Sequence, residues 1–231
     1  RFFDVIRGAA GTALALLPLY RKNGSREVLN TAVHCGEHLL KNRTAAHKEF
    51  RVWKTLEHSP ALAGFAHGAA GIAYALVALY RETRRKDFLD AAVEAMAFET
   101  DLFDSSEMNW PDRRGDDDSP GDGDASRFMC AWCQGAAGIG LSRVGGLDVI
   151  DSPAIRNDIQ AALQTTLQFP FQARDHLCCG NAGRAEVLLT AGIAVSERRW
   201  IDGAQRLTSS VIGRARRNGR FNTRLERGFY N

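Results

Sequence analysis

Residues able to bind metals or transfer protons stand just before Gly-x-x-Gly segments of this sequence. They are Asp4 in DVIRG, His67 in AHG, Cys133 in WCQG, and Cys178 with Cys179 in CCGN. A loop that only has to turn favours Ser, Asn or Asp, whereas cysteine and histidine are among the better metal ligands. The pattern predicts a functional site built from distant parts of the chain.

The three cysteines of these motifs could hold one zinc ion. Three thiolates provide soft, tetrahedral ligation and leave a fourth position for water or a substrate thiolate. Zinc would also lower the pKa of a bound thiol and deliver it as a thiolate at neutral pH. The alternatives are packing residues or a strained disulfide between Cys178 and Cys179. Cys35 and Cys130 lie outside the pattern and are interpreted as packing residues.

His67 and Asp4 have simple alternative explanations. A single histidine before a helix can cap that helix or bind a backbone carbonyl. A carboxylate near a helix N-terminus is favourable through the helix dipole alone. Only the shared position in a repeat favours a chemical role for both residues.

The repeat itself starts at Gly8, Gly68, Gly135 and Gly180, with intervals of 60, 67 and 45 residues. Each start continues into Ala and Leu at helical spacing and is followed by a second amphipathic helical pattern, such as residues 25–42. No sustained alternation of apolar and polar residues favours a substantial sheet. The sequence therefore predicts an all-α fold of helix pairs, with the Ala- and Gly-rich helices innermost. Such pairs could close into a ring around a common cavity or form an open solenoid without a site.

Composition excludes some classes of partner. The chain of 231 residues carries 30 basic and 27 acidic residues, a net charge of +3 that gives no reason to expect nucleic acid. Its apolar windows are too short to span a membrane. Five cysteines, an odd number, suit a reducing cytoplasm. The chain begins at Arg1 without an initiator Met or a signal peptide, so we expect it to be part of a longer protein.

Four segments in order, DVIRGAAG, GFAHGAAGIAYAL, WCQGAAGIGLSR and CCGNAG, resemble the lanthionine synthetase C-like family over nearly the whole chain. Within that family, Cys-Cys-Gly and the stretch NWPD at 109–112 resemble the C-terminal cyclase domain of class II lanthipeptide synthetases, called LanM. The resemblance implies an α/α toroid, a double ring of helices. Residues 1–231 would then be part of one cyclase domain, about four helix-pair repeats truncated at both ends, with a dehydratase domain upstream.

The resemblance also implies an activity. A zinc-dependent lanthipeptide cyclase adds cysteine thiols to dehydroalanine or dehydrobutyrine within a dehydrated precursor peptide, forming (methyl)lanthionine thioether rings. Cys133, Cys178 and Cys179 match the zinc ligands of the family. His67 matches its active-site histidine, which would transfer protons, and Asp4 matches an acidic residue that would orient this histidine.

Three features leave alternatives open. Some family members carry Arg and Tyr where this chain has Met129 and Gln134, and Arg127 is close enough in sequence to replace the charge. A LanC-like protein could also bind zinc and thiol peptides or glutathione without forming rings. A toroidal glycoside hydrolase would need two facing carboxylates, and Asp4 has no acidic counterpart at another repeat start. The acidic segment 104–128 is either a peptide-contacting loop or disordered.

Overall fold

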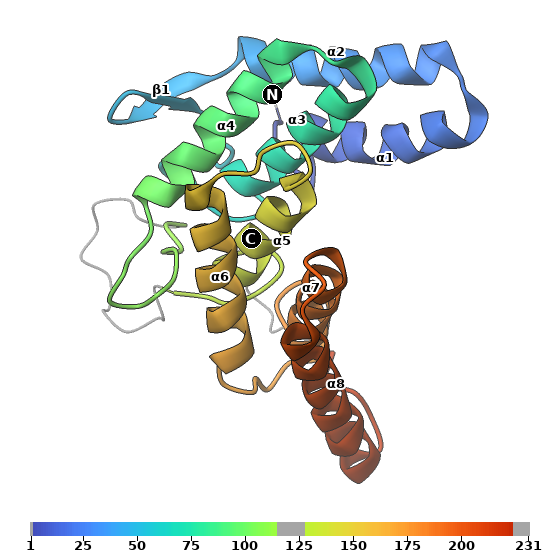
Figure 1. The fold of residues 1–231 in the computed structure, drawn as a ribbon, viewed down its shortest axis with the longest axis vertical. Coiled ribbons are helices and arrows are strands. Elements are labelled where there is room, and N and C mark those ends of the chain that lie inside the picture. Colours follow the sequence, from blue (N-terminus) through green and yellow to red (C-terminus); the bar gives the residue numbers. More distant parts are fainter. Residues whose placement is uncertain (1, 115–127, 224–231) are drawn as a thin grey trace.

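The computed structural model describes residues 2–114 and 128–223 of the chain, and Arg127 lies outside them. This part folds into four helix pairs and one small hairpin (Figure 1). The helices are α1 (Ala9–Asn23), α2 (Arg26–Lys41), α3 (Ala69–Thr83), α4 (Lys86–Asp101), α5 (Ala136–Gly146), α6 (Pro153–Gln168), α7 (Asn181–Ala194) and α8 (Arg198–Asn218). The pairs follow one another in chain order, from α1 and α2 at the top of Figure 1 to α7 and α8 at the bottom.

The first helix of each pair belongs to an inner layer. Helix α1 contacts α3, α3 contacts α5, and α5 contacts α7, while each of them also packs against the helix that follows it in the chain. Helices α3 and α5 are buried along most of their length because neighbours cover them on several sides. Small Ala and Gly side chains allow this close packing. The predicted all-α fold with Ala-rich inner helices is confirmed.

Local sequence signals set several helix ends. The hydroxyl of Ser25 accepts a hydrogen bond from Val28 N at the start of α2, and that of Ser152 accepts one from Ile155 N at the start of α6. Pro153 occupies the first turn of α6, where its missing N–H costs nothing. These caps fix where the outer helices begin.

The second glycine of each Gly-x-x-Gly lies against the backbone of the loop before it. A Cβ on Gly71 would lie 1.9 Å from the carbonyl oxygen of Phe65, and one on Gly138 would lie 2.2 Å from that of Trp132. The same Cβ atoms would meet the preceding repeat, at 2.6 Å from Val5 Cγ2 and 2.9 Å from Phe65 Cβ respectively. Glycine at this position therefore lets each loop fold back onto the helix that follows it. The loop of the preceding repeat packs against the same glycine.

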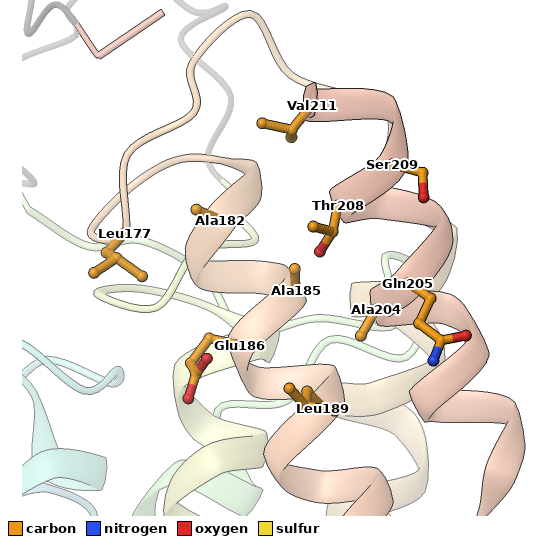
Figure 2. Close-up of a pocket in the computed structure, with 10 residues that line it drawn as sticks. All are labelled: Leu177, Ala182, Ala185, Glu186, Leu189, Ala204, Gln205, Thr208, Ser209 and Val211. Atoms are coloured by element: carbon orange, nitrogen blue, oxygen red, sulfur yellow. The ribbon is translucent and has the colours of Figure 1, made fainter. Parts of the chain in front are cut away.

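Leu177 occupies the equivalent loop position of the fourth repeat. Its side chain is 65% exposed, because no further helix of the described chain covers it. It lines a pocket of about 420 Å³ along α7 and α8, together with Leu189 and Val211 (Figure 2). This apolar face of α7 is thus the open flank of the described helices.

A buried ion network joins α4, α5 and α6. Arg143 is fully buried and donates to Glu99 Oε2 at 2.9 Å and to Asp158 Oδ2 at 3.1 Å. Glu99 also accepts from the backbone N–H of Gly64 at 3.0 Å. Burial raises the pKa of Glu99, against the attraction of Arg143. The network ties the outer helices to the loop that carries His67.

The hairpin was not predicted from the sequence. Its strands, β1 (Thr44–His47) and β2 (Phe50–Val52), are antiparallel and short, and β2 packs on α4. Across the two described ranges, no helix combines the length and apolarity that crossing a membrane requires.

Candidate functional site

The three cysteines of the two C-terminal motifs meet in space. The Sγ atom of Cys179 lies 3.4 Å from that of Cys133 and 3.3 Å from that of Cys178, and all three lie within 4.8 Å of one another. Cys133 is buried, whereas Cys178 and Cys179 are half-buried. The cluster, called the thiol cluster below, is therefore accessible from one side.

The geometry of the thiol cluster suits a tetrahedral metal ion. Zinc–sulfur bonds of about 2.3 Å place tetrahedral sulfur ligands about 3.8 Å apart, close to the spacing found here. All three cysteines are free thiols, so the sulfurs are available as ligands. The group could hold a metal.

Three thiols this close cannot all ionise without a cation. Hydrogen bonding with Cys133 and Cys178 lowers the pKa of Cys179. Hydrogen bonding with Cys178 and Cys179, together with burial, raises the pKa of Cys133. The first thiolate is therefore stabilised by the two remaining thiols, and its charge opposes the loss of their protons. A divalent cation would remove this repulsion and favour three thiolates.

Backbone hydrogen bonds connect the four loops that precede the inner helices. Val5 N donates to Ala66 O at 3.1 Å, Ala66 N donates to Cys133 O at 3.0 Å, and Cys133 N donates to Cys178 O at 3.3 Å. The side chain of Ala66 also packs with Cys133. The loops of all four repeats therefore lie side by side at one end of the inner helices.

Asp4 and His67 form a pair within these connected loops. His67 Nδ1 and Asp4 Oδ2 are 2.6 Å apart, and the backbone N–H of Arg7 donates to Asp4 Oδ1 at 2.8 Å. Asp4 is only 2% exposed. Burial alone would raise the pKa of Asp4, but the hydrogen bonds from His67 and Arg7 outweigh it and lower that pKa. The ionised carboxylate thus accepts the Nδ1 proton of the imidazole, which leaves Nε2 as the acceptor.

Sequence reasoning missed Arg114, which lies beside the thiol cluster. Its Nε and Nη2 donate to the Asp112 carboxylate, with the Nη2 bond at 2.6 Å, and Nη2 is 3.2 Å from Met129 Sδ. With its amide oriented to satisfy both ends, Gln134 donates to Ala63 O and accepts from Arg114 Nε at 3.3 Å. The position of Arg114 two residues after NWPD was the one sequence signal that could have drawn attention to it.

Arg114 also interacts electrostatically with the sulfurs. Hydrogen bonds to Asp112 raise the pKa of Arg114, and attraction to Cys133 and Cys179 raises it further. In return, the guanidinium lowers the pKa of Cys179. Met129 packs against the buried cluster of Ala66, Ala131 and Cys133. A positive charge is therefore available at the thiol cluster although Met129 itself carries none.

His176 also contacts the thiol cluster and was not singled out from the sequence. Its Nδ1 accepts a hydrogen bond from Cys179 N at 3.1 Å, so its proton is on Nε2, which is buried and has no hydrogen-bond partner among the described residues. The ring holds the turn between Cys178 and the start of α7. The signal in the sequence was a histidine two residues before the adjacent cysteines.

The two remaining cysteines and the acidic residue Asp175 lie outside the candidate site. Cys130 is fully buried and contacts Thr166 Oγ1, and Cys35 lies half-buried on α2, so neither joins the thiol cluster. Asp175, the acidic residue nearest the last repeat start, is bonded to Asn181, Arg214 and the backbone of Asn222. It anchors a loop and is not a free carboxylate.

The fold and the site define an α/α-toroid protein with a candidate metal centre where its inner helices begin. A family described as lanthionine synthetase C-like protein matches residues 1–231. The chain belongs to this family, and its fold is that of a lanthipeptide cyclase. No curated protein matches the sequence.

Solved structures share the fold at low sequence identity. They include a GH76 α-mannanase from Bacteroides thetaiotaomicron (TM-score 0.65, 15% identity, 92% of this chain and 58% of that one). A sugar epimerase from a ruminal bacterium matches with a TM-score of 0.63 and 12% identity, over 90% of this chain and 60% of that one. Nisin cyclase matches with a TM-score of 0.61 and 15% identity, over 92% of this chain and 59% of that one. The chain thus spans less than two thirds of each neighbour.

Proposed function

We propose that this chain belongs to a zinc-dependent lanthipeptide cyclase of the LanM type, acting in the cytoplasm on a dehydrated precursor peptide. The observation that carries the proposal is the meeting of three cysteine sulfurs within 4.8 Å, at the end of the inner helices where Asp4 and His67 also pair. The Cys178–Cys179 pair favours the LanM subgroup. About four repeats of one cyclase domain and an upstream dehydratase domain remain part of this proposal.

Cys133, Cys178 and Cys179 would hold the zinc ion. Bound there, zinc would supply Lewis acidity and a fourth position for the substrate thiolate. Cys178 and Cys179 are half-exposed, so a peptide could reach the thiol cluster. Three thiolate ligands place more negative charge on the metal than a Cys-Cys-His site, which favours a nucleophilic substrate sulfur.

His67 transfers the protons in this mechanism. Its Nε2 takes the proton of the substrate S–H group, and the sulfur forms a bond to the β-carbon of dehydroalanine or dehydrobutyrine. The electron pair of the carbon–carbon double bond moves onto the carbonyl to give an enolate. The imidazolium then returns a proton to the α-carbon, so that no proton is gained or lost overall.

Asp4 holds His67 in the tautomer that this step requires. Its buried carboxylate accepts the Nδ1 proton and stabilises the imidazolium after proton uptake. The lowered pKa of Asp4 keeps it ionised at neutral pH. Asp4 is thus a positioning residue and His67 the catalytic one.

Metal analysis of the purified full-length protein tests the site first. We expect near one equivalent of zinc, lost on Cys133→Ala, Cys178→Ala or Cys179→Ala and retained on Cys35→Ala, whose thiol lies on α2 away from the thiol cluster. A protein that binds no metal after exposure to zinc would contradict the proposal.

Ring formation tests the reaction. The zinc-loaded protein is incubated with a synthetic peptide carrying one cysteine and one dehydroalanine, and free thiols are counted over time. We expect thiol loss without a change in peptide mass, slowed about 10²-fold or more by His67→Asn. Constant thiol content with zinc bound would instead identify a protein that binds thiol peptides without cyclising them.

A further inference from the structure

The loop after NWPD brings a cation to the thiol cluster in a fixed orientation. Asp112 holds Arg114 along its Nε and Nη2 edge, and Met129 and Gln134 contact the same edge. Met129 packs against the buried cluster that Cys133 forms with Ala66 and Ala131, and Gln134 follows Cys133 in the chain. No described residue accepts a hydrogen bond from the remaining nitrogen, Nη1. The guanidinium is therefore held by contacts along its Nε and Nη2 edge, and the N–H groups of Nη1 can donate to another acceptor.

A positively charged donor beside the thiol cluster would offset negative charge that the reaction places there. Three thiolates and one divalent cation leave a net charge of −1, and a substrate thiolate makes it −2. Addition to a dehydroamino acid then transfers the negative charge of the substrate sulfur to the carbonyl oxygen, because the electron pair of the double bond moves onto that oxygen while the sulfur becomes a neutral thioether. A fixed guanidinium nearby counteracts this charge without reorganising during the reaction.

We propose that Arg114 is an anion-binding residue of this site, whose Nη1 donates to the enolate oxygen of a peptide undergoing thiol addition beside Cys133 and Cys179. The proposal rests on the proposed function for the identity of the anion. The local positive potential at the cysteines does not depend on that function and is measured separately.

Alkylation of the metal-free protein measures this potential. Iodoacetate is an anion and iodoacetamide is neutral, so the ratio of their rates at one cysteine reports the local charge and cancels changes in thiol reactivity. The rates are followed by peptide mass spectrometry after zinc removal with a chelator. Cys35 on α2 serves as an internal reference.

We expect the iodoacetate to iodoacetamide ratio at Cys133 and Cys179 to fall about five- to tenfold in Arg114→Gln, the effect of one unit charge near a protein surface. Arg114→Lys, which keeps the charge, should retain most of the ratio. Arg156→Gln is the matched control, because Arg156 also pairs with an aspartate, Asp151, but lies exposed on α6. If the Arg114→Gln ratio stays within twofold of wild type, the proposal is wrong.

Cyclisation of the cysteine–dehydroalanine peptide then tests the role in the reaction. We expect kcat to fall about 10²-fold in Arg114→Gln at unchanged zinc content, with partial recovery in Arg114→Lys. A wild-type protein that makes no rings would overturn the proposed function, yet the alkylation ratio would still report on Arg114. Normal ring formation by Arg114→Gln would overturn the proposal for Arg114 alone.

Discussion

Replacing Gly138 by alanine should destabilise the fold and disturb the metal site together. Gly138 lies in the first turn of α5, where a Cβ would be 2.2 Å from Trp132 O and 2.9 Å from Phe65 Cβ. Because the loop backbone is on one side and the preceding repeat on the other, neither neighbour can simply rotate away. Trp132 directly precedes Cys133, so any backbone shift moves a member of the thiol cluster.

The size of the effect follows from these distances. The Trp132 carbonyl must retreat by about 0.8 Å to reach 3.0 Å, below which real Cβ contacts essentially never occur. Backbone shifts forced by an added methyl group in a packed interior cost about 1–3 kcal/mol. We expect about 3 kcal/mol here, because the Phe65 contact blocks the opposite direction. The altered position of Cys133 should weaken zinc binding about tenfold or more.

Urea unfolding followed by circular dichroism, with a zinc competition titration, measures both effects. Gly213→Ala on α8 is the matched control, since its nearest neighbour is the flexible Arg217 Nη1 at 3.6 Å. It should gain about 0.5–1 kcal/mol from reduced unfolded-state entropy. Equal unfolding free energies for Gly138→Ala and wild type would refute the close-approach explanation of the Gly-x-x-Gly motif.

Further variants test the parts of the fold that hold the site. Arg143→Leu leaves Glu99 and Asp158 buried without their cation and should lower the free energy of unfolding by about 3–5 kcal/mol; a loss below 1 kcal/mol in urea titrations would argue against the network. Ser152→Ala removes the cap of α6 and should cost about 1 kcal/mol in the same assay. The pKa of Asp4 is lowered below 3.8 in the folded protein, so its ionisation stabilises the fold above that pH and the contribution is lost as pH falls through the folded pKa. Asp4→Asn should therefore show a smaller drop in unfolding free energy between pH 5 and pH 2 than wild type, and an unchanged acid limb would contradict the pairing with His67.

Much of the candidate site could be predicted because the Gly-x-x-Gly segments make the repeat recognisable in the sequence. Each Gly-x-x-Gly marks the same structural position, so residues just before Gly8, Gly68, Gly135 and Gly180 had to share one end of the inner helices. The meeting of the three cysteines and the pairing of Asp4 with His67 follow that expectation. Their chemical roles remain proposals.

Arg114 and His176 could not be assigned from the sequence. Neither stands at the repeated position, and both approach the thiol cluster through side chains that extend from loops of irregular length. The expectation that Arg127 could replace a missing charge concerns a residue outside the described part of the chain, whereas Arg114 is in place beside Met129. Loop geometry depends on contacts such as Arg114–Asp112, which no local pattern encodes.

The sequence by itself determined the helix pairs, their order, and which residue types stand where the inner helices begin, because helical periodicity and capping are local properties. Only the tertiary structure decided that Val5, Ala66, Cys133 and Cys178 join their loops through successive backbone hydrogen bonds. It also decided that Arg114 contacts Gln134 and Met129, next to a cluster of sulfurs from two repeats. Contacts between residues far apart in the chain depend on how the helices pack, and that packing is settled only when the whole core forms.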